Sequence, residues 1–156
     1  MKKWLLLLII AVLAFLQLIW PVFLSFFNCK PDLLLILIVA LVFYFDFKTA
    51  IVFAIIAGLT KDAFLPQVFA LNTILFSIWG YLIYLLSRQI SIEVVYVRSA
   101  IVLIAALLTN IITGLQIINS GLIIPLGIFL RSLIISSIYT AALSPLVFKL
   151  VKKLAA

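Results

Sequence analysis

The 156-residue chain has no histidine, a single cysteine and only four acidic residues. Histidine and paired carboxylates provide most metal ligands and most general acids and bases, so their scarcity disfavours a metal centre and acid–base catalysis. The sequence also has no Gly-rich phosphate loop and no nucleophile constellation, and we expect no cofactor. One cysteine cannot form an internal disulfide, so it does not indicate a redox compartment.

Apolar residues dominate instead: 69% of the chain is hydrophobic and 10% is charged. Four uncharged stretches approach or exceed about 20 residues, the length that crosses the hydrocarbon core of a bilayer. They cover residues 4–29, 63–87, 99–130 and 132–148. This composition predicts one integral membrane domain over residues 1–156, in contact with membrane lipid.

The net charge of +7 does not indicate nucleic acid, because the basic residues lie at the edges of the apolar stretches and set membrane topology. The start, Met1-Lys2-Lys3 followed by leucines, imitates a secretory signal. No A-x-A cleavage site follows, and the apolar stretch continues to Phe27. We therefore expect a retained first helix.

Two shorter apolar stretches, 33–45 and 49–60, lie between the first two long ones. If residues 31–60 formed one helix, Asp46 and Lys48 would lie near mid-membrane, which costs roughly 2.5 to 3.5 kcal/mol for each charge. Two short helices avoid this cost. Aromatic residues at 43–45 and at 47 mark the turn between them as a membrane interface.

The sequence therefore predicts an all-α membrane protein, a six-helix bundle with short second and third helices. The expected helices cover residues 4–27, 31–45, 48–61, 68–87, 99–118 and 124–150, and residues 88–98 are expected at the surface. Six crossings place both termini on one side. With cytoplasmic termini, eight of the eleven basic residues lie on that side and only Lys30, Lys61 and Arg131 on the other.

Small residues form a stripe at helical spacing along the third expected helix. They are Ala50, Ala54, Ala57 and Gly58. Such a stripe lets another backbone approach closely. Packing inside the bundle is the favoured interpretation, and a docking face for a partner helix is the alternative.

Polar residues mark one face of each of the last three expected helices. The faces consist of Thr73, Ser77, Gly80 and Tyr84; of Ala106, Thr109, Thr113 and Gln116 with Asn110; and of Ser132, Ser136, Thr140 and Ser144. We expect these faces to point into the bundle, because hydroxyl groups in membranes often bond across helices. Lining of a small-molecule cavity is the alternative.

Three single residues suggest local roles. Pro31 suits the first turn of the second helix. Asp62 either caps the fourth helix or pairs with Lys61, and a functional role is the alternative. Arg131 is expected to extend to the membrane interface rather than to bind a ligand.

Three segments, in this order, resemble the central pattern of the MreD family of rod-shape-determining proteins. They are Pro31-Asp32-Leu33-Leu34-Leu35, Ala57-Gly58-Leu59-Thr60-Lys61-Asp62 and Trp79-Gly80-Tyr81-Leu82. The end, from Leu130-Arg131-Ser132 to Ser144-Pro145-Leu146, resembles the last helix of that family. The chain departs from the pattern at residues 45–48 and 64–67, where relatives often carry glycine.

The resemblance implies a noncatalytic, multi-pass component of the bacterial cell-elongation machinery in the cytoplasmic membrane. Such a protein binds MreC, a single-pass protein, and acts with MreB filaments, RodA and the penicillin-binding transpeptidase in peptidoglycan synthesis. The resemblance also implies a fold similar to the S components of energy-coupling-factor transporters. A homo-oligomer is left open.

A vitamin-binding S component is the runner-up function. S components usually dock through an Ala-x-x-x-Ala motif in their first helix, whereas the first helix here offers only Ala11 and Ala14. A third interpretation is a transporter or enzyme for a lipid-linked intermediate, with Asp62 or Arg131 on a phosphate. Its support is thin, because one Arg and one Asp do not make a diphosphate site.

Overall fold

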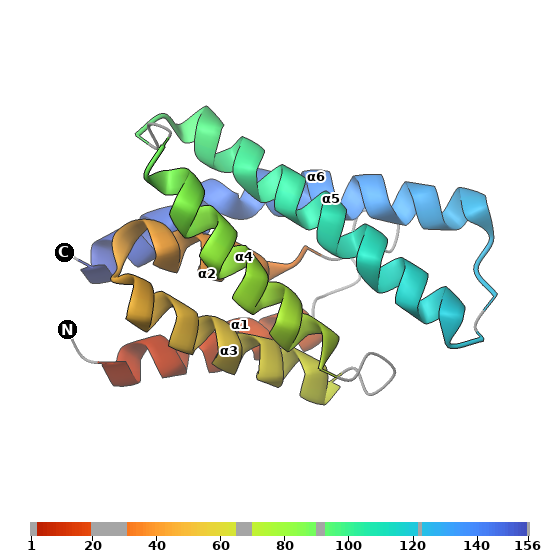
Figure 1. Cartoon of the computed structure of the whole chain (residues 1–156), viewed down its shortest axis with the longest axis horizontal. Coiled ribbons are helices and arrows are strands. Elements are labelled where there is room, and N and C mark those ends of the chain that lie inside the picture. Colours follow the sequence, from red (N-terminus) through yellow and green to blue (C-terminus); the bar gives the residue numbers. More distant parts are fainter. Residues whose placement is uncertain (1–2, 20–30, 65–69, 90–92, 122, 156) are drawn as a thin grey trace.

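The computed structural model describes residues 3–19, 31–64, 70–89, 93–121 and 123–155. Within these ranges the chain forms six α-helices, which confirms the all-α, six-helix prediction. They are α1 Lys3–Leu18, α2 Leu33–Tyr44, α3 Phe47–Phe64, α4 Leu71–Ser87, α5 Val95–Asn119 and α6 Leu126–Ala155. The start of α1 and the end of α6 lie at the same end of the molecule (Figure 1).

The short helix α2 is the centre of the bundle. Residues 33–42 are all buried, and α2 packs against each of the other five helices. These positions are apolar without exception, and a helix that is hydrophobic on every side is stable only among other apolar groups. With 12 residues, α2 is about 18 Å long and much shorter than the hydrocarbon core of a bilayer.

The turn after α2 separates it from α3 where the sequence predicts. Phe45 is extended, with φ −125° and ψ 169°, and its N–H donates to the Leu41 carbonyl as α2 ends. Asp46 is exposed, and α3 begins at Phe47. Two helices, rather than one long helix, therefore cover this region. Only α2 is short, because α3, expected over 48–61, has 18 residues.

Pro31 is one correction to the expected boundaries. It was expected in the first turn of the second helix, but it precedes the N-cap, Asp32, and α2 begins at Leu33. The Asp32 side chain accepts a hydrogen bond from the Leu35 N–H. Capping by Asp32 therefore places the helix start after Pro31.

Other helix ends also differ from the expected ranges. α3 continues to Phe64, three residues beyond the expected end at 61, so Asp62 lies in its last turn rather than in a loop. α5 begins at Val95, four residues before the expected start at 99, so part of the expected surface segment is helical. Arg98 anchors this first turn, because it donates to the Tyr44 hydroxyl at the end of α2 at 2.6 Å. The part of the first expected helix beyond residue 19 lies outside the described residues.

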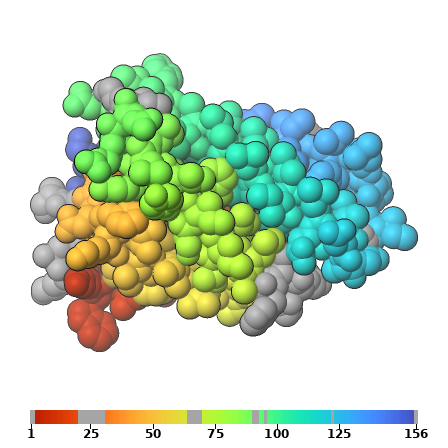
Figure 2. Space-filling view, in the orientation of Figure 1, coloured from red at the N-terminus to blue at the C-terminus, as the bar shows by residue number. Residues whose placement is uncertain are grey.

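Among the described residues, α5 and α6 supply the two helices that are long and apolar enough to cross a membrane, Tyr96–Asn119 and Leu126–Leu154. They pack along each other, and their far ends project past the other helices (Figure 1). In the space-filling view, α4 lies between α3 and α5 on the visible face, and the α5–α6 end extends beyond them (Figure 2). The bundle therefore has a thick end and a thin end.

The polar faces of α5 and α6 point into the bundle where the helices overlap, as predicted, with Thr109, Thr140 and Ser144 buried. Asn110 Nδ2 donates to Ser137 Oγ between α5 and α6 at 3.1 Å. Trp79 Nε1 on α4 donates to Thr109 Oγ1 on α5 at 2.8 Å. Gln116 and Ser132 are exceptions, because both lie on the projecting ends of α5 and α6 and are exposed.

α6 contains Pro145 and continues through it. Proline has no N–H for the carbonyl four residues earlier, which here belongs to Ala141. The Ser144 hydroxyl donates to that carbonyl at 2.6 Å instead. The serine before the proline therefore restores the hydrogen bond that the proline removes.

Candidate functional site

Asp32 connects three helices at the start of α2. Its Oδ1 accepts the Leu35 N–H at 3.2 Å, and its own N–H donates to Thr140 Oγ1 on α6 at 3.0 Å. Its Oδ2 accepts from Lys61 Nζ on α3 at 2.5 Å. Thr140 is fully buried and Asp32 nearly so, which places these bonds inside the bundle. One residue thus holds the start of α2 against α3 and α6.

The Asp32–Lys61 ion pair is shielded from solvent. The two side chains are 10% and 14% exposed, respectively. Lys61 Nζ also lies 5.3 Å from the centre of the Phe76 ring on α4, which is a favourable cation–π distance. The pair therefore connects α2 and α3 and contacts α4.

Asp62 caps α4 from the last turn of α3. Its Oδ1 accepts the Asn72 N–H at 3.0 Å, and its Oδ2 accepts the N–H and the hydroxyl of Thr73 at 2.9 and 2.6 Å. The N-cap position of α4 is Ala70, which has φ 59° and no side-chain oxygen to offer. Of the two local roles open for Asp62, the structure has the cap, and Lys61 binds Asp32 instead.

Gly58 gives a physical reason for the spacing between glycine and aspartate. A Cβ on Gly58 would lie 2.5 Å from Thr73 Cα and 2.9 Å from Thr73 N. Residues four apart lie on the same face of a helix, so Gly58 admits the α4 backbone one turn before Asp62 caps it. The pattern Gly-x-x-x-Asp therefore docks the start of α4 on α3.

The small-residue stripe extends this α3–α4 contact. Its alanines are fully buried: Ala50, Ala54 and Ala57. On the facing helix, a Cβ on Gly80 would lie 3.1 Å from Ile51 Cδ1 and 3.8 Å from Ala54 Cβ. The stripe lies in the interior of the bundle, where its alanines offer no surface to a helix of another protein.

The structure brings two of the segments that carry the family resemblance together. Residues 31–32 and 58–62 meet through the Asp32–Lys61 pair, and we call Asp32, Lys61, Asp62, Thr73 and Thr140 the interhelix cluster. Gly80 lies further along α4 in the same α3–α4 contact. Arg131 is exposed near the start of α6 and is not part of the cluster.

Asn72 is a polar residue beside this cluster that no sequence pattern had singled out. Its side chain is fully buried, and neither Nδ2 nor Oδ1 has a hydrogen-bond partner among the described residues. The only feature of the sequence that could have drawn attention to Asn72 is its position, as a polar residue in the first turn of an apolar helix. Thr140 had been noted only as part of a polar face, since it lies 108 residues from Asp32.

The interhelix cluster can hold helices together, but its polar atoms are occupied. The side-chain oxygens of Asp32 and Asp62 each accept at least one hydrogen bond within the bundle. In the part of the chain that the structure describes, no three His, Cys, Asp or Glu side chains come together as metal ligands. The arrangement is suited to a structural connection.

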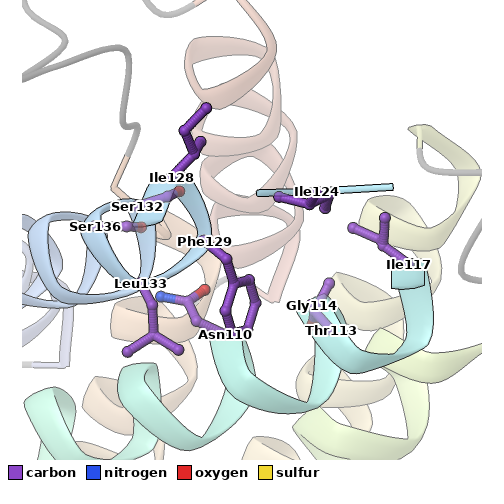
Figure 3. A pocket seen from close by; sticks show the side chains of 10 residues that line it. All are labelled: Asn110, Thr113, Gly114, Ile117, Ile124, Ile128, Phe129, Ser132, Leu133 and Ser136. Atoms are coloured by element: carbon purple, nitrogen blue, oxygen red, sulfur yellow. The ribbon is translucent and has the colours of Figure 1, made fainter. Parts of the chain in front are cut away.

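A second feature is a hollow of about 320 Å³ between the projecting ends of α5 and α6. Figure 3 shows Asn110, Thr113 and Gly114 on the α5 side and Ser132 and Ser136 on the α6 side. The remaining lining is apolar: Ile117, Ile124, Ile128, Phe129 and Leu133. The polar faces of α5 and α6 thus line a cavity at this end, which was the alternative interpretation of these residues.

A family model described as rod shape-determining protein MreD matches residues 1–154. The chain belongs to the MreD family. No curated protein and no solved structure matches it significantly.

Family membership assigns the chain to rod shape determination. MreD proteins are membrane proteins of the cell-shape machinery and are not known as an enzyme family. In this MreD protein, the residues at 31–32 and 58–62 act on each other across α2, α3 and α4. The two motifs therefore form one structural unit.

Proposed function

We propose that this MreD protein is a noncatalytic membrane scaffold that binds MreC and thereby helps to organise peptidoglycan synthesis, together with MreB, RodA and the penicillin-binding transpeptidase. The family match over residues 1–154 carries the proposal. The interhelix cluster supports it, because a scaffold needs helices in fixed positions and the cluster ties α2, α3, α4 and α6 together.

The proposal includes a topology. Six crossings of the cytoplasmic membrane leave both termini in the cytoplasm, together with most of the basic residues. The start of α1 and the end of α6 lie at one end of the molecule, which agrees with both termini on one side of the membrane (Figure 1). A reporter fused to the C-terminus tests it: a cytoplasmic fluorescent protein should be active there, and periplasmic alkaline phosphatase should not.

The proposal also extends to the fold, which we infer to be of the S-component kind, with the short helix α2 at its centre. The central test is copurification. MreC from the same genome, tagged and co-expressed, should bring down this chain stoichiometrically after solubilisation. Failure in several detergents, with both proteins present in the membrane fraction, would count heavily against a scaffold for MreC.

A further inference from the structure

We propose that the hollow between α5 and α6 is the site where a transmembrane helix of a partner protein docks, with a hydrogen-bonding side chain of that helix reaching into it. The inference rests on the proposed function, because it locates the surface that a single-pass membrane partner uses. Three observations carry it: the depth of the hollow, its accessibility and the chemistry of its lining.

The deep end of the hollow lies at the depth of the hydrocarbon core. Arg131 and Lys149 are exposed cations on α6, and the helix between them is uncharged. Their separation corresponds to about 27 Å of helix, close to the thickness of the core. Ser132 and Ser136 lie one and five residues after Arg131, whereas Ile124, Ile128 and Phe129 precede it, so the hollow spans this interface and its deep end reaches into the core.

The described remainder of the chain leaves the hollow accessible. The α5–α6 end projects past α3 and α4, as Figure 1 shows. Ser132 is exposed, and Asn110 and Thr113 are half-buried. A partner in the membrane can therefore reach these side chains from the side.

The lining favours a polypeptide helix over a lipid tail. Asn110 uses its Nδ2 on Ser137, and Figure 3 shows its amide oxygen on the side of Phe129, at the hollow. A hydrocarbon tail would leave such oxygens without a donor, which is unfavourable in a membrane, whereas a helix carrying Ser, Thr, Asn or Gln supplies one. On the α6 side, the small residues Ser132 and Ser136 also allow close approach of a helix backbone, whereas the space beside Gly114 is filled by Phe129.

The size of the hollow agrees with this occupant. Its volume of about 320 Å³ is at the lower limit of small-molecule sites, which span about 300–1,000 Å³. It fits a few side chains of a neighbouring helix better than a whole cofactor or vitamin. We therefore expect a groove contact along α5 and α6 rather than an enclosed ligand.

Site-specific photo-crosslinking tests the location. A benzophenone amino acid is placed at Thr113 or Ser132 in the full chain, co-expressed with full-length MreC, and irradiated in intact membranes. Matched control positions are Ile78 on α4 and Leu8 on α1, which are exposed and outside the hollow. MreC adducts should form from both hollow positions and at least about fivefold less from the controls.

A large side chain that fills the hollow provides a second test of the docking site. Ser132→Trp should lower the recovery of MreC in a pull-down about tenfold, because the indole occupies the space for the partner side chain. Ile134→Trp, at an exposed position on α6 outside the hollow, should leave recovery unchanged. Thermal unfolding of both variants shows whether the fold is kept. If Ser132→Trp does not fold, the crosslinks alone decide.

The outcomes separate the two proposals. Copurification with adducts only from Ile78 or Leu8 overturns the hollow and leaves the scaffold standing. Adducts from the hollow only to a second copy of this chain, or only to phospholipid, also overturn it. An unaltered chain that never copurifies with MreC overturns the scaffold itself.

Discussion

Gly58 and Thr73 bring α3 and α4 together backbone to backbone, since a Cβ on Gly58 would lie 2.5 Å from Thr73 Cα. The N–H of the same threonine is held by Asp62, one turn further along α3. Close approach and helix capping thus act on one residue of α4. A change at either position should loosen the start of α4.

Gly58→Ala should destabilise the protein by about 1–3 kcal/mol, because the new methyl group meets backbone that cannot rotate away. Thermal unfolding in detergent measures this, and about 2–4 °C is expected for each kcal/mol in a chain of this size. Gly127→Ala on α6 is the matched control, because no atom lies within 4 Å of its Cβ position. It should be neutral or stabilising by up to about 1 kcal/mol. Equal effects of the two substitutions would contradict the close approach.

Asp32→Asn should destabilise by about 3–5 kcal/mol, because asparagine keeps the cap of α2 but leaves Lys61 charged and unpaired. Adding Lys61→Met to this variant should recover a large part of the loss. Asp46→Asn, at an exposed position, should change stability by less than about 0.5 kcal/mol. Thermal unfolding of the wild type, Asp32→Asn, Lys61→Met and the double variant forms a double-mutant cycle, with Asp46→Asn as the control. Simple additivity at Asp32 and Lys61 would show that the pair is not coupled.

Asp62→Ala should open the first turn of α4. The substitution leaves the N–H groups of Asn72 and Thr73 without their acceptor, which costs about 0.5–2 kcal/mol for a lost cap. Hydrogen–deuterium exchange should therefore rise in a peptide that covers residues 71–75. The start of α5 serves as the internal control and should exchange as before. Unchanged protection at residues 71–75 would show that another group caps α4.

Ser144→Ala should destabilise by about 1 kcal/mol, because the Ala141 carbonyl then has neither an N–H from position 145 nor a hydroxyl donor. In a Pro145→Ala background, position 145 supplies the N–H, and the cost of Ser144→Ala should shrink. A smaller part should persist there, since Ser144 Oγ also lies 3.3 Å from Ser99 Oγ. Thermal unfolding of the cycle checks this, and an identical cost in both backgrounds would exclude the compensation.

The sequence predicts the features that depend on local pattern. Continuous apolar residues at 33–42 and charges at Asp46 and Lys48 were enough to predict two separate helices and a short α2. The end of α3 was placed too early, directly after Lys61, because Asp62 is typical of a loop when its partners are unknown. Both stay helical because each finds a partner on another helix, Asp32 and Thr73.

Long-range pairing could not be predicted in the same way. The only partner that the sequence suggests for Lys61 is its neighbour Asp62, as one of two options, whereas its actual partner lies 29 residues away. The orientation of Gln116 was wrong for a related reason. A polar face points into a bundle only where another helix covers it. The covered length depends on how far α5 extends past α4, and the residue pattern of one helix does not contain that distance.

The bond from Asp32 to Thr140 also constrains how the protein is made. Thr140 is synthesised 108 residues after Asp32, so α2 leaves the ribosome long before one of its partners exists. At about 18 Å, α2 is too short to cross a membrane alone. Lys61, the partner of Asp32 on α3, leaves the ribosome much earlier than Thr140. We expect α2 and α3 to enter the membrane as a hairpin, with α6 closing the bundle last. Force profiles of translation-arrested chains that end before and after residue 140 would reveal this order of assembly.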